Sequence, residues 1–108
     1  MKRRSAADDR AASTSLQALS RALASLGKTE DVRAFLQDLC TPAELEAMAD
    51  RWRVVPLLLK GVPYREIHDL TEVSVTTIGR VARTLESGAG GYAAALRRQQ
   101  SRSTAASH

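Results

Sequence analysis

Apolar residues recur along most of this chain at the three- and four-residue spacing that is typical of amphipathic helices. The first such stripe consists of four leucines: Leu16, Leu19, Leu23 and Leu26. It predicts a helix that ends where Gly27 can take the left-handed conformation, and a second helix that Thr29 caps. No stretch alternates apolar and polar residues over a useful length. The pattern therefore predicts an all-α fold.

A third helix start is marked by the segment Thr41-Pro42-Ala43-Glu44. Thr41 can cap the helix, Pro42 suits the first helical position, and Glu44 completes a capping box. One face of the helix that follows carries Leu45, Met48, Trp52, Val55 and Leu59. We expect a kink or break at Pro56 and an end at Gly61.

Residues 63–86 have the layout of a helix-turn-helix. A short helix is predicted from Pro63 or Tyr64 to about Leu70, followed by a three-residue turn and a helix that Ser74 caps. The expected inward positions are Ile67, Leu70, Val75, Ile78, Ala82 and Leu85. In such a unit the second helix enters the major groove of DNA.

Hydroxyls and arginines occupy the outward side of this second helix, with no acidic residue before Glu86. Arginine suits bidentate contacts to guanine and phosphate. We expect contacts to bases or nearby phosphates from Ser74, Val75, Thr76, Thr77 and Arg80, and contacts to the DNA backbone from Lys60, Tyr64, Arg65 and Arg83. A solvated helix face in an ordinary bundle would show the same pattern.

Composition adds two constraints. The 108 residues include 18 alanines and only one Trp, one Phe and two Tyr, so a monomer would have a thin core that oligomerisation could supplement. The net charge of +4 comes from basic ends around a mildly acidic middle. This charge makes nucleic acid a plausible partner, although a genome rich in G and C also encodes arginine freely.

The remaining features define the expected setting. Cys40 is the single cysteine, which excludes an internal disulfide and a zinc site of the Cys/His kind. No signal peptide or membrane span is indicated, so we expect a soluble cytoplasmic protein without membrane contact. Residues 1–12 and 99–108 are interpreted as disordered tails, and residues 13–98 as a single domain.

Several separate strings carry a family likeness: Arg33 to Thr41, Glu44 to Arg53, Lys60-Gly61, Tyr64 to Ile67, Thr76 to Val81, and Leu85 to Tyr92. On these strings the chain resembles the YerC/YecD branch of the Trp repressor superfamily, which are bacterial helix-turn-helix proteins. The resemblance implies an intertwined homodimer that binds a palindromic operator on double-stranded DNA. It implies a transcriptional regulator, expected to be a repressor, located at the bacterial nucleoid.

Some positions depart from the family pattern. His68 stands where two helices usually meet at alanine, and Glu72 stands at the usual glycine of the turn, so we expect a shifted turn or a slightly opened unit. We expect His68 to have a packing role. The resemblance implies an effector pocket at Thr41, Arg51, Arg80 and Thr84. Asp38, Cys40 and Val81 argue against tryptophan there, so we expect no cofactor and leave another small effector open.

No catalytic constellation is present in the sequence. It contains no Ser/His/Asp set, no paired catalytic carboxylates and no phosphate-binding loop of recognised spacing, so we expect no enzyme. The alternative function is a helical protein-interaction adaptor that has lost specific DNA reading through Glu72 and His68.

Overall fold

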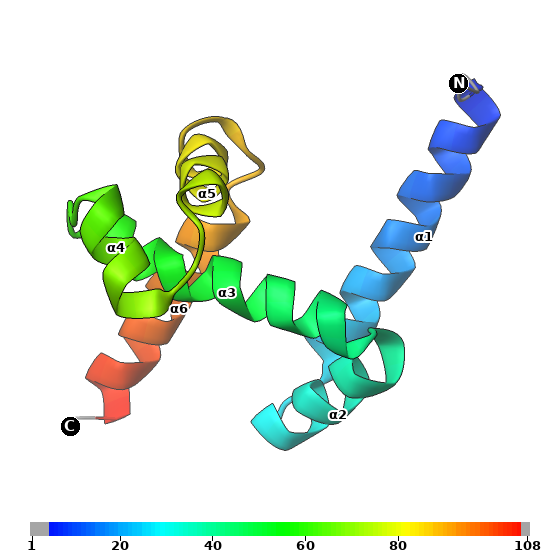
Figure 1. The fold of residues 1–108 in the computed structure, drawn as a ribbon. Helices are drawn as coiled ribbons and strands as arrows, with labels where there is room; N and C mark the ends of the chain where they lie inside the picture. The colour runs from blue at the N-terminus through cyan, green and yellow to red at the C-terminus, as the bar shows by residue number, and fades with distance from the viewer. Residues whose placement is uncertain (1–4, 107–108) are drawn as a thin grey trace. The chain divides into compact units, whose positions relative to one another are not determined.

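A computed structural model of the chain describes residues 5–106, and the side chains of residues 5–102. Within residues 5–106 the chain forms six helices and no strand (Figure 1): α1 (Ala6–Ser25), α2 (Thr29–Leu39), α3 (Pro42–Leu59), α4 (Tyr64–Thr71), α5 (Val75–Ser87) and α6 (Gly91–Ala106). The all-α prediction is confirmed. The chain divides into two compact units, one up to Pro42 and one from Ala43 onward, where the sequence predicts a single domain over residues 13–98.

The first helix, α1, begins earlier in the chain than the sequence predicts. A disordered tail is predicted over residues 1–12, but residues 6–12 are helical, while residues 1–4 lie outside the described residues. A capping box explains the early start, because Asp8 N donates to Ser5 Oγ at 3.1 Å and Ser5 N donates to Asp8 Oδ2 at 3.2 Å. Alanine, the best helix former, then extends the helix.

Between α1 and α2 the chain turns without a left-handed glycine. Leu26 ends α1 in an extended conformation, and Gly27 does not have a positive φ, so the predicted glycine cap is wrong. Lys28 is the N-cap of α2, and Thr29 is its first helical residue rather than its cap. Neither α1 nor α2 contains a buried residue, and Leu16 is 63% exposed. The described residues of this unit therefore form no buried core of their own.

The second unit contains the core. Its buried side chains are aliphatic and come from α3, α4, the turn and α5: Val54, Val55, Ile67, Val73, Ile78 and Val81. Trp52 of α3 packs against this core, and its ring lies 6.3 Å from the ring of Tyr92, centroid to centroid. This contact connects α3 with α6, and Trp52 is a core residue as its stripe predicts.

Several residues of the apolar stripes are exposed. Met48, Leu59, Leu70 and Val75 are exposed by 40%, 54%, 64% and 50%. On α5 the predicted inward residues Ile78 and Leu85 are buried and packed against the core, respectively, and Val81 is buried in addition. Val75 is turned toward the solvent at the start of α5.

Helix α3 continues through Pro56, which contradicts a break there, while the alternative of a kink stays a prediction. The Pro56 carbonyl accepts a hydrogen bond from Lys60 N at 3.1 Å, so the hydrogen-bond pattern of the helix continues past the proline. Gly61, with φ of 80°, then ends the helix as predicted, while Gly61 N and Val62 N donate to the carbonyls of Leu58 and Leu57. This is the Schellman pattern, which needs a left-handed residue and so favours glycine.

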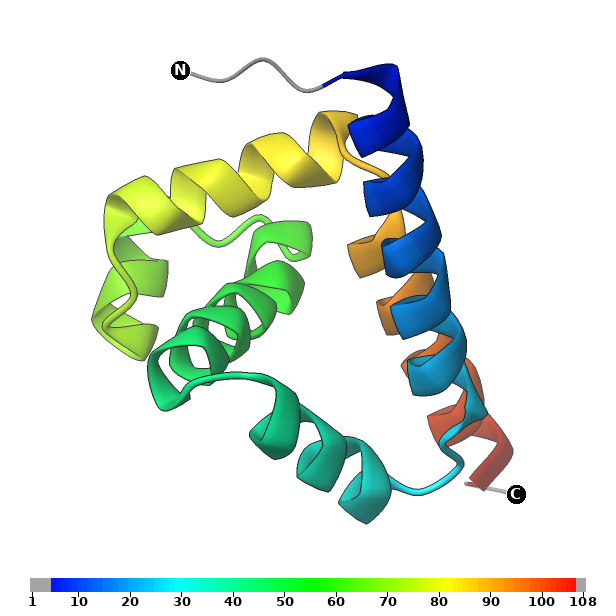
Figure 2. The same ribbon diagram turned by 90° about the vertical axis from the view of Figure 1, so that its right-hand side faces the viewer.

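Helix α6 is much longer than predicted. The sequence predicts one or two turns over residues 92–98 and a disordered tail over residues 99–108, but the helix runs to Ala106, and residues 107–108 lie outside the described residues. The segment after Gly91 has no proline or glycine and is rich in Ala, Arg and Gln, all good helix formers. Figure 2 shows α5 running from the turn after α4 to the loop that leads into α6. Among the described residues no helix is long and apolar enough to cross a membrane.

Candidate nucleic-acid interface

Helices α4 and α5 and the turn between them form the predicted helix-turn-helix. Glu72 ends α4 in the left-handed conformation, with φ of 64° and ψ of 6°, and its N–H donates to the His68 carbonyl at 2.7 Å. The turn is therefore not shifted by the missing glycine. Glu72 instead adopts the geometry that a glycine would have, at a cost of about 1 kcal/mol.

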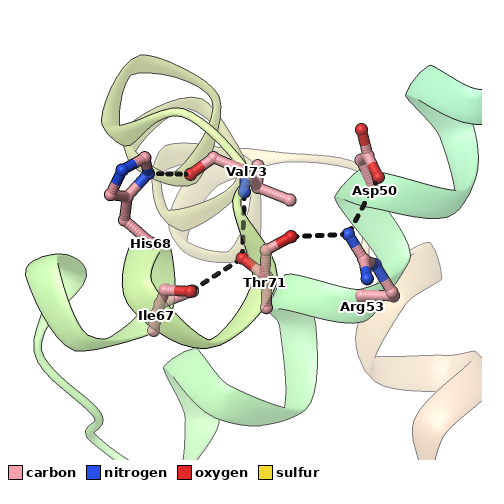
Figure 3. Close-up of polar contacts among 6 residues, drawn as sticks. All are labelled: Asp50, Arg53, Ile67, His68, Thr71 and Val73. Atoms are coloured by element: carbon pink, nitrogen blue, oxygen red, sulfur yellow. Dashed lines mark hydrogen bonds and ion pairs between the residues drawn. The ribbon is translucent and has the colours of Figure 1, made fainter.

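Side-chain hydrogen bonds hold the turn in this shape (Figure 3). Thr71 Oγ1 donates to the Ile67 carbonyl at 2.7 Å and accepts from Val73 N at 3.1 Å. His68 Nδ1 lies 2.8 Å from the Val73 carbonyl oxygen. The expected packing role of His68 is wrong, because its side chain is exposed and bonded across the turn.

Arg53 of α3 contacts the same turn. Its Nη2 donates to the Thr71 carbonyl at 2.9 Å and to Asp50 Oδ1 at 3.1 Å (Figure 3). Sequence reasoning missed this residue. Its spacing from Asp50 indicates a local ion pair, but no sequence signal connects it with Thr71, which lies 18 residues away.

The start of α5 is fixed by its predicted cap. Thr77 N donates to Ser74 Oγ at 3.1 Å, and Ser74 Oγ donates to Thr77 Oγ1 at 3.0 Å. The Ser74 hydroxyl is thus engaged within the helix cap, while its side chain remains exposed. Thr77 is half-buried. Both residues remain predicted DNA contacts.

The outward face of α5 carries three exposed polar side chains. Thr76, Arg80 and Arg83 are separated by four and three residues, so they share one side of the helix. Exposed Val75 precedes them in the first turn. Since α5 has no acidic residue before Glu86, this face combines positive charge with a hydroxyl donor and acceptor.

The contact between α4 and α5 falls near a glycine. A Cβ built on Gly79 would lie 3.6 Å from Arg83 Nη1 and 3.9 Å from Tyr64 Cε2, so both side chains converge over Gly79. Tyr64 is 43% exposed, and Lys60 and Arg65 nearby in the sequence are also exposed. The structure thus brings Tyr64 of α4 together with Arg83 of α5.

The predicted effector residues are divided between the two units of the chain. Thr41 belongs to the first unit, Arg51 is half-buried on α3, and Arg80 is exposed on α5. Thr84 Oγ1 donates to the Arg80 carbonyl at 3.0 Å. Val81 is fully buried in the core.

Thr84 also lines a cavity of about 320 Å³ where α5 leads into α6. Its lining includes neither Arg51 nor Arg80 and is mostly apolar: Thr84, Leu85, Ala89, Gly90, Gly91, Tyr92 and Ala93. Among the described residues no group of three or more His, Cys, Asp or Glu side chains could hold a metal ion.

Comparisons with known proteins agree with this architecture. The sequence profile of the Trp repressor protein family matches residues 14–100. The uncharacterized protein YerC of Bacillus subtilis (strain 168) is 36% identical over 92 residues, which cover 85% of this chain and 88% of YerC. The crystal structure of a candidate Trp repressor from Staphylococcus aureus is 31% identical, with a TM-score of 0.75 over 81% of this chain and 87% of that chain.

The chain belongs to the Trp repressor family. This family consists of DNA-binding regulators and is not a family of enzymes. The resemblance to its YerC/YecD branch is confirmed by the match to YerC.

Proposed function

We propose that this protein is a transcriptional repressor that binds a specific DNA sequence by inserting α5 into the major groove. The observation that carries the proposal is the outward face of α5, on which Thr76, Arg80 and Arg83 are exposed and no acidic residue precedes Glu86. Membership of the Trp repressor family supports the proposal. Helix α5 follows the turn after α4, which is the position of the DNA-reading helix in a helix-turn-helix. An arginine on such a face can bind guanine through two hydrogen bonds.

The nine proposed contact residues divide by role. Residues in the first two turns of α5 reach base edges or nearby phosphates: Ser74, Val75, Thr76, Thr77 and Arg80. Residues at the end of α3, the start of α4 and farther along α5 hold the DNA backbone: Lys60, Tyr64, Arg65 and Arg83. The backbone contacts would set the register in which α5 reads the bases.

We further propose that the active form is a homodimer. None of the described residues of the first unit is buried, although α1 and its C-cap carry the stripe of Leu16, Leu19, Leu23 and Leu26. A second copy of the chain would cover this stripe and supply the core that the unit lacks. Two-fold symmetry would place the two α5 helices about 34 Å apart and match a palindromic operator.

In this proposal the protein acts on the nucleoid in the bacterial cytoplasm, without a catalytic role or a cofactor. The proposal names no effector. The residues proposed for an effector pocket are Thr41, Arg51, Arg80 and Thr84, and Val81 in the core argues against tryptophan.

Selection of bound duplexes from a random DNA pool, followed by titration at two salt concentrations, tests the proposal. A DNA-reading repressor enriches one palindromic sequence and shows a steep decrease of affinity with salt. A protein-interaction adaptor, the alternative function, shows neither sequence enrichment nor a steep salt dependence. Binding that depends on salt but not on sequence would contradict specific reading.

A further inference from the structure

We infer that Arg53 is a positioning residue that sets the angle at which α5 reads DNA, an inference that rests on the proposed function. Arg53 lies on α3, outside the nine proposed contact residues. Its guanidinium reaches the Thr71 carbonyl at 2.9 Å, the last residue of α4. It therefore connects α3 directly with the turn that precedes α5.

The other hydrogen bonds of the turn are local. The bonds made by His68, Thr71, Glu72 and Val73 begin and end within residues 67–73, whereas Arg53 connects the turn to a different helix. The carbonyls at a helix C-terminus lack intrahelical partners and carry partial negative charge, so a guanidinium is well suited to bind them. Glu72 caps α4 through its own N–H, and Arg53 adds from α3 a donor to a second carbonyl at the same end of the helix.

Asp50 holds the guanidinium in place. Asp50 Oδ1 accepts from the same Nη2 at 3.1 Å, one turn earlier on α3. The two side chains are exposed by 53% and 35%, and ion pairs this exposed contribute little to stability. The contribution of Arg53 is therefore geometric, and we expect its loss to affect DNA specificity more than folding.

Base reading depends on geometry more strongly than phosphate binding does. Hydrogen bonds from Thr76 and Arg80 to base edges require one orientation of α5 in the major groove. Salt-dependent contacts to phosphates tolerate a tilt of the helix. If Arg53 holds this angle, replacing it should lower specific affinity and leave non-specific affinity unchanged.

The experiment compares Arg53→Met with Arg53→Lys and with Arg98→Met, which removes an exposed arginine from α6. Each variant is titrated with the selected duplex and with a scrambled duplex of equal length, at two salt concentrations. For Arg53→Met we expect the ratio of specific to non-specific affinity to decrease roughly tenfold, the effect of one hydrogen bond to a charged group. Arg53→Lys keeps a cation that can donate to Thr71, so it should recover most of the ratio, and Arg98→Met should retain it.

Two outcomes would overturn the inference while leaving the proposed function intact. An unchanged ratio in Arg53→Met would show that Arg53 does not position α5. Equal weakening on both duplexes with a salt slope lower by about one would make Arg53 a phosphate contact. If the wild-type protein binds neither duplex, the proposed function fails, and the inference fails with it.

A variant that leaves Arg53 in place provides a second test if Arg53→Met does not fold. Asp50→Asn removes the carboxylate that orients the guanidinium and keeps every proposed DNA contact. A smaller decrease of the same ratio, at an unchanged salt slope, supports the inference. An unchanged ratio in a folded Asp50→Asn protein contradicts it.

Discussion

His68 Nδ1 lies 2.8 Å from the carbonyl oxygen of Val73, so a side chain of α4 spans the turn and binds the residue that precedes the cap of α5. We expect His68→Ala to lower the free energy of unfolding by about 1 kcal/mol, the usual contribution of one such hydrogen bond. Urea unfolding measures this change. His68→Asn is the matched control. Its amide nitrogen can occupy the position of Nδ1, so this variant should recover part of the free energy of unfolding that His68→Ala loses. Equal stabilities of the wild type and the alanine variant would contradict the role of His68.

Glu72 offers a site where a substitution should stabilise the protein. Its φ of 64° is unfavourable for a residue with a Cβ and is readily adopted by glycine. The free energy of unfolding of the Glu72→Gly variant should therefore be about 1 kcal/mol higher than that of the Glu72→Ala variant. The alanine variant controls for the lost charge. The left-handed turn would be in doubt if alanine were as stable as glycine at this position.

Gly88 should not tolerate a larger residue. A Cβ built there would lie 2.5 Å from the Thr84 carbonyl oxygen and 2.8 Å from Thr84 Cγ2. We expect Gly88→Ala to lower the melting temperature by several degrees, since overpacking typically costs about 1–3 kcal/mol. Gly91→Ala is the control, because a Cβ at Gly91 meets no atom within 4 Å at the first position of α6. That variant should be as stable as the wild type or slightly more stable.

Dimerisation is tested on the stripe of α1. Leu16 is 63% exposed in the single chain, so a monomer would lose little if Leu16 were replaced by aspartate. In the proposed dimer Leu16→Asp should shift the protein toward monomers, while Gln17→Asp beside the stripe should not. Sedimentation at micromolar concentration distinguishes these results. A wild-type protein that sediments there as a folded monomer would contradict the dimer.

Local signals in the sequence predicted the helix-turn-helix well. The cap at Ser74, the end of α3 at Gly61 and the start of α4 near Tyr64 all depend on residues within four positions of each other. Contacts over longer separations were not predictable, such as the hydrogen bond from Arg53 to Thr71. The predicted start of α1 and the predicted end of α6 are wrong, because alanine-rich polar segments can be either helical or disordered. In α1 the capping box at Ser5 favours the helix.

The central claim is that α5 reads bases, and titration of the selected duplex with Arg80→Ala and Arg65→Ala variants tests it most directly. Arg80→Ala should lower specific affinity by about 1–3 kcal/mol and relax sequence preference. Arg65→Ala should weaken binding to all sequences alike and lower the salt slope by about one. Unchanged specific affinity in the Arg80→Ala variant would contradict the assignment of α5 as the reading helix.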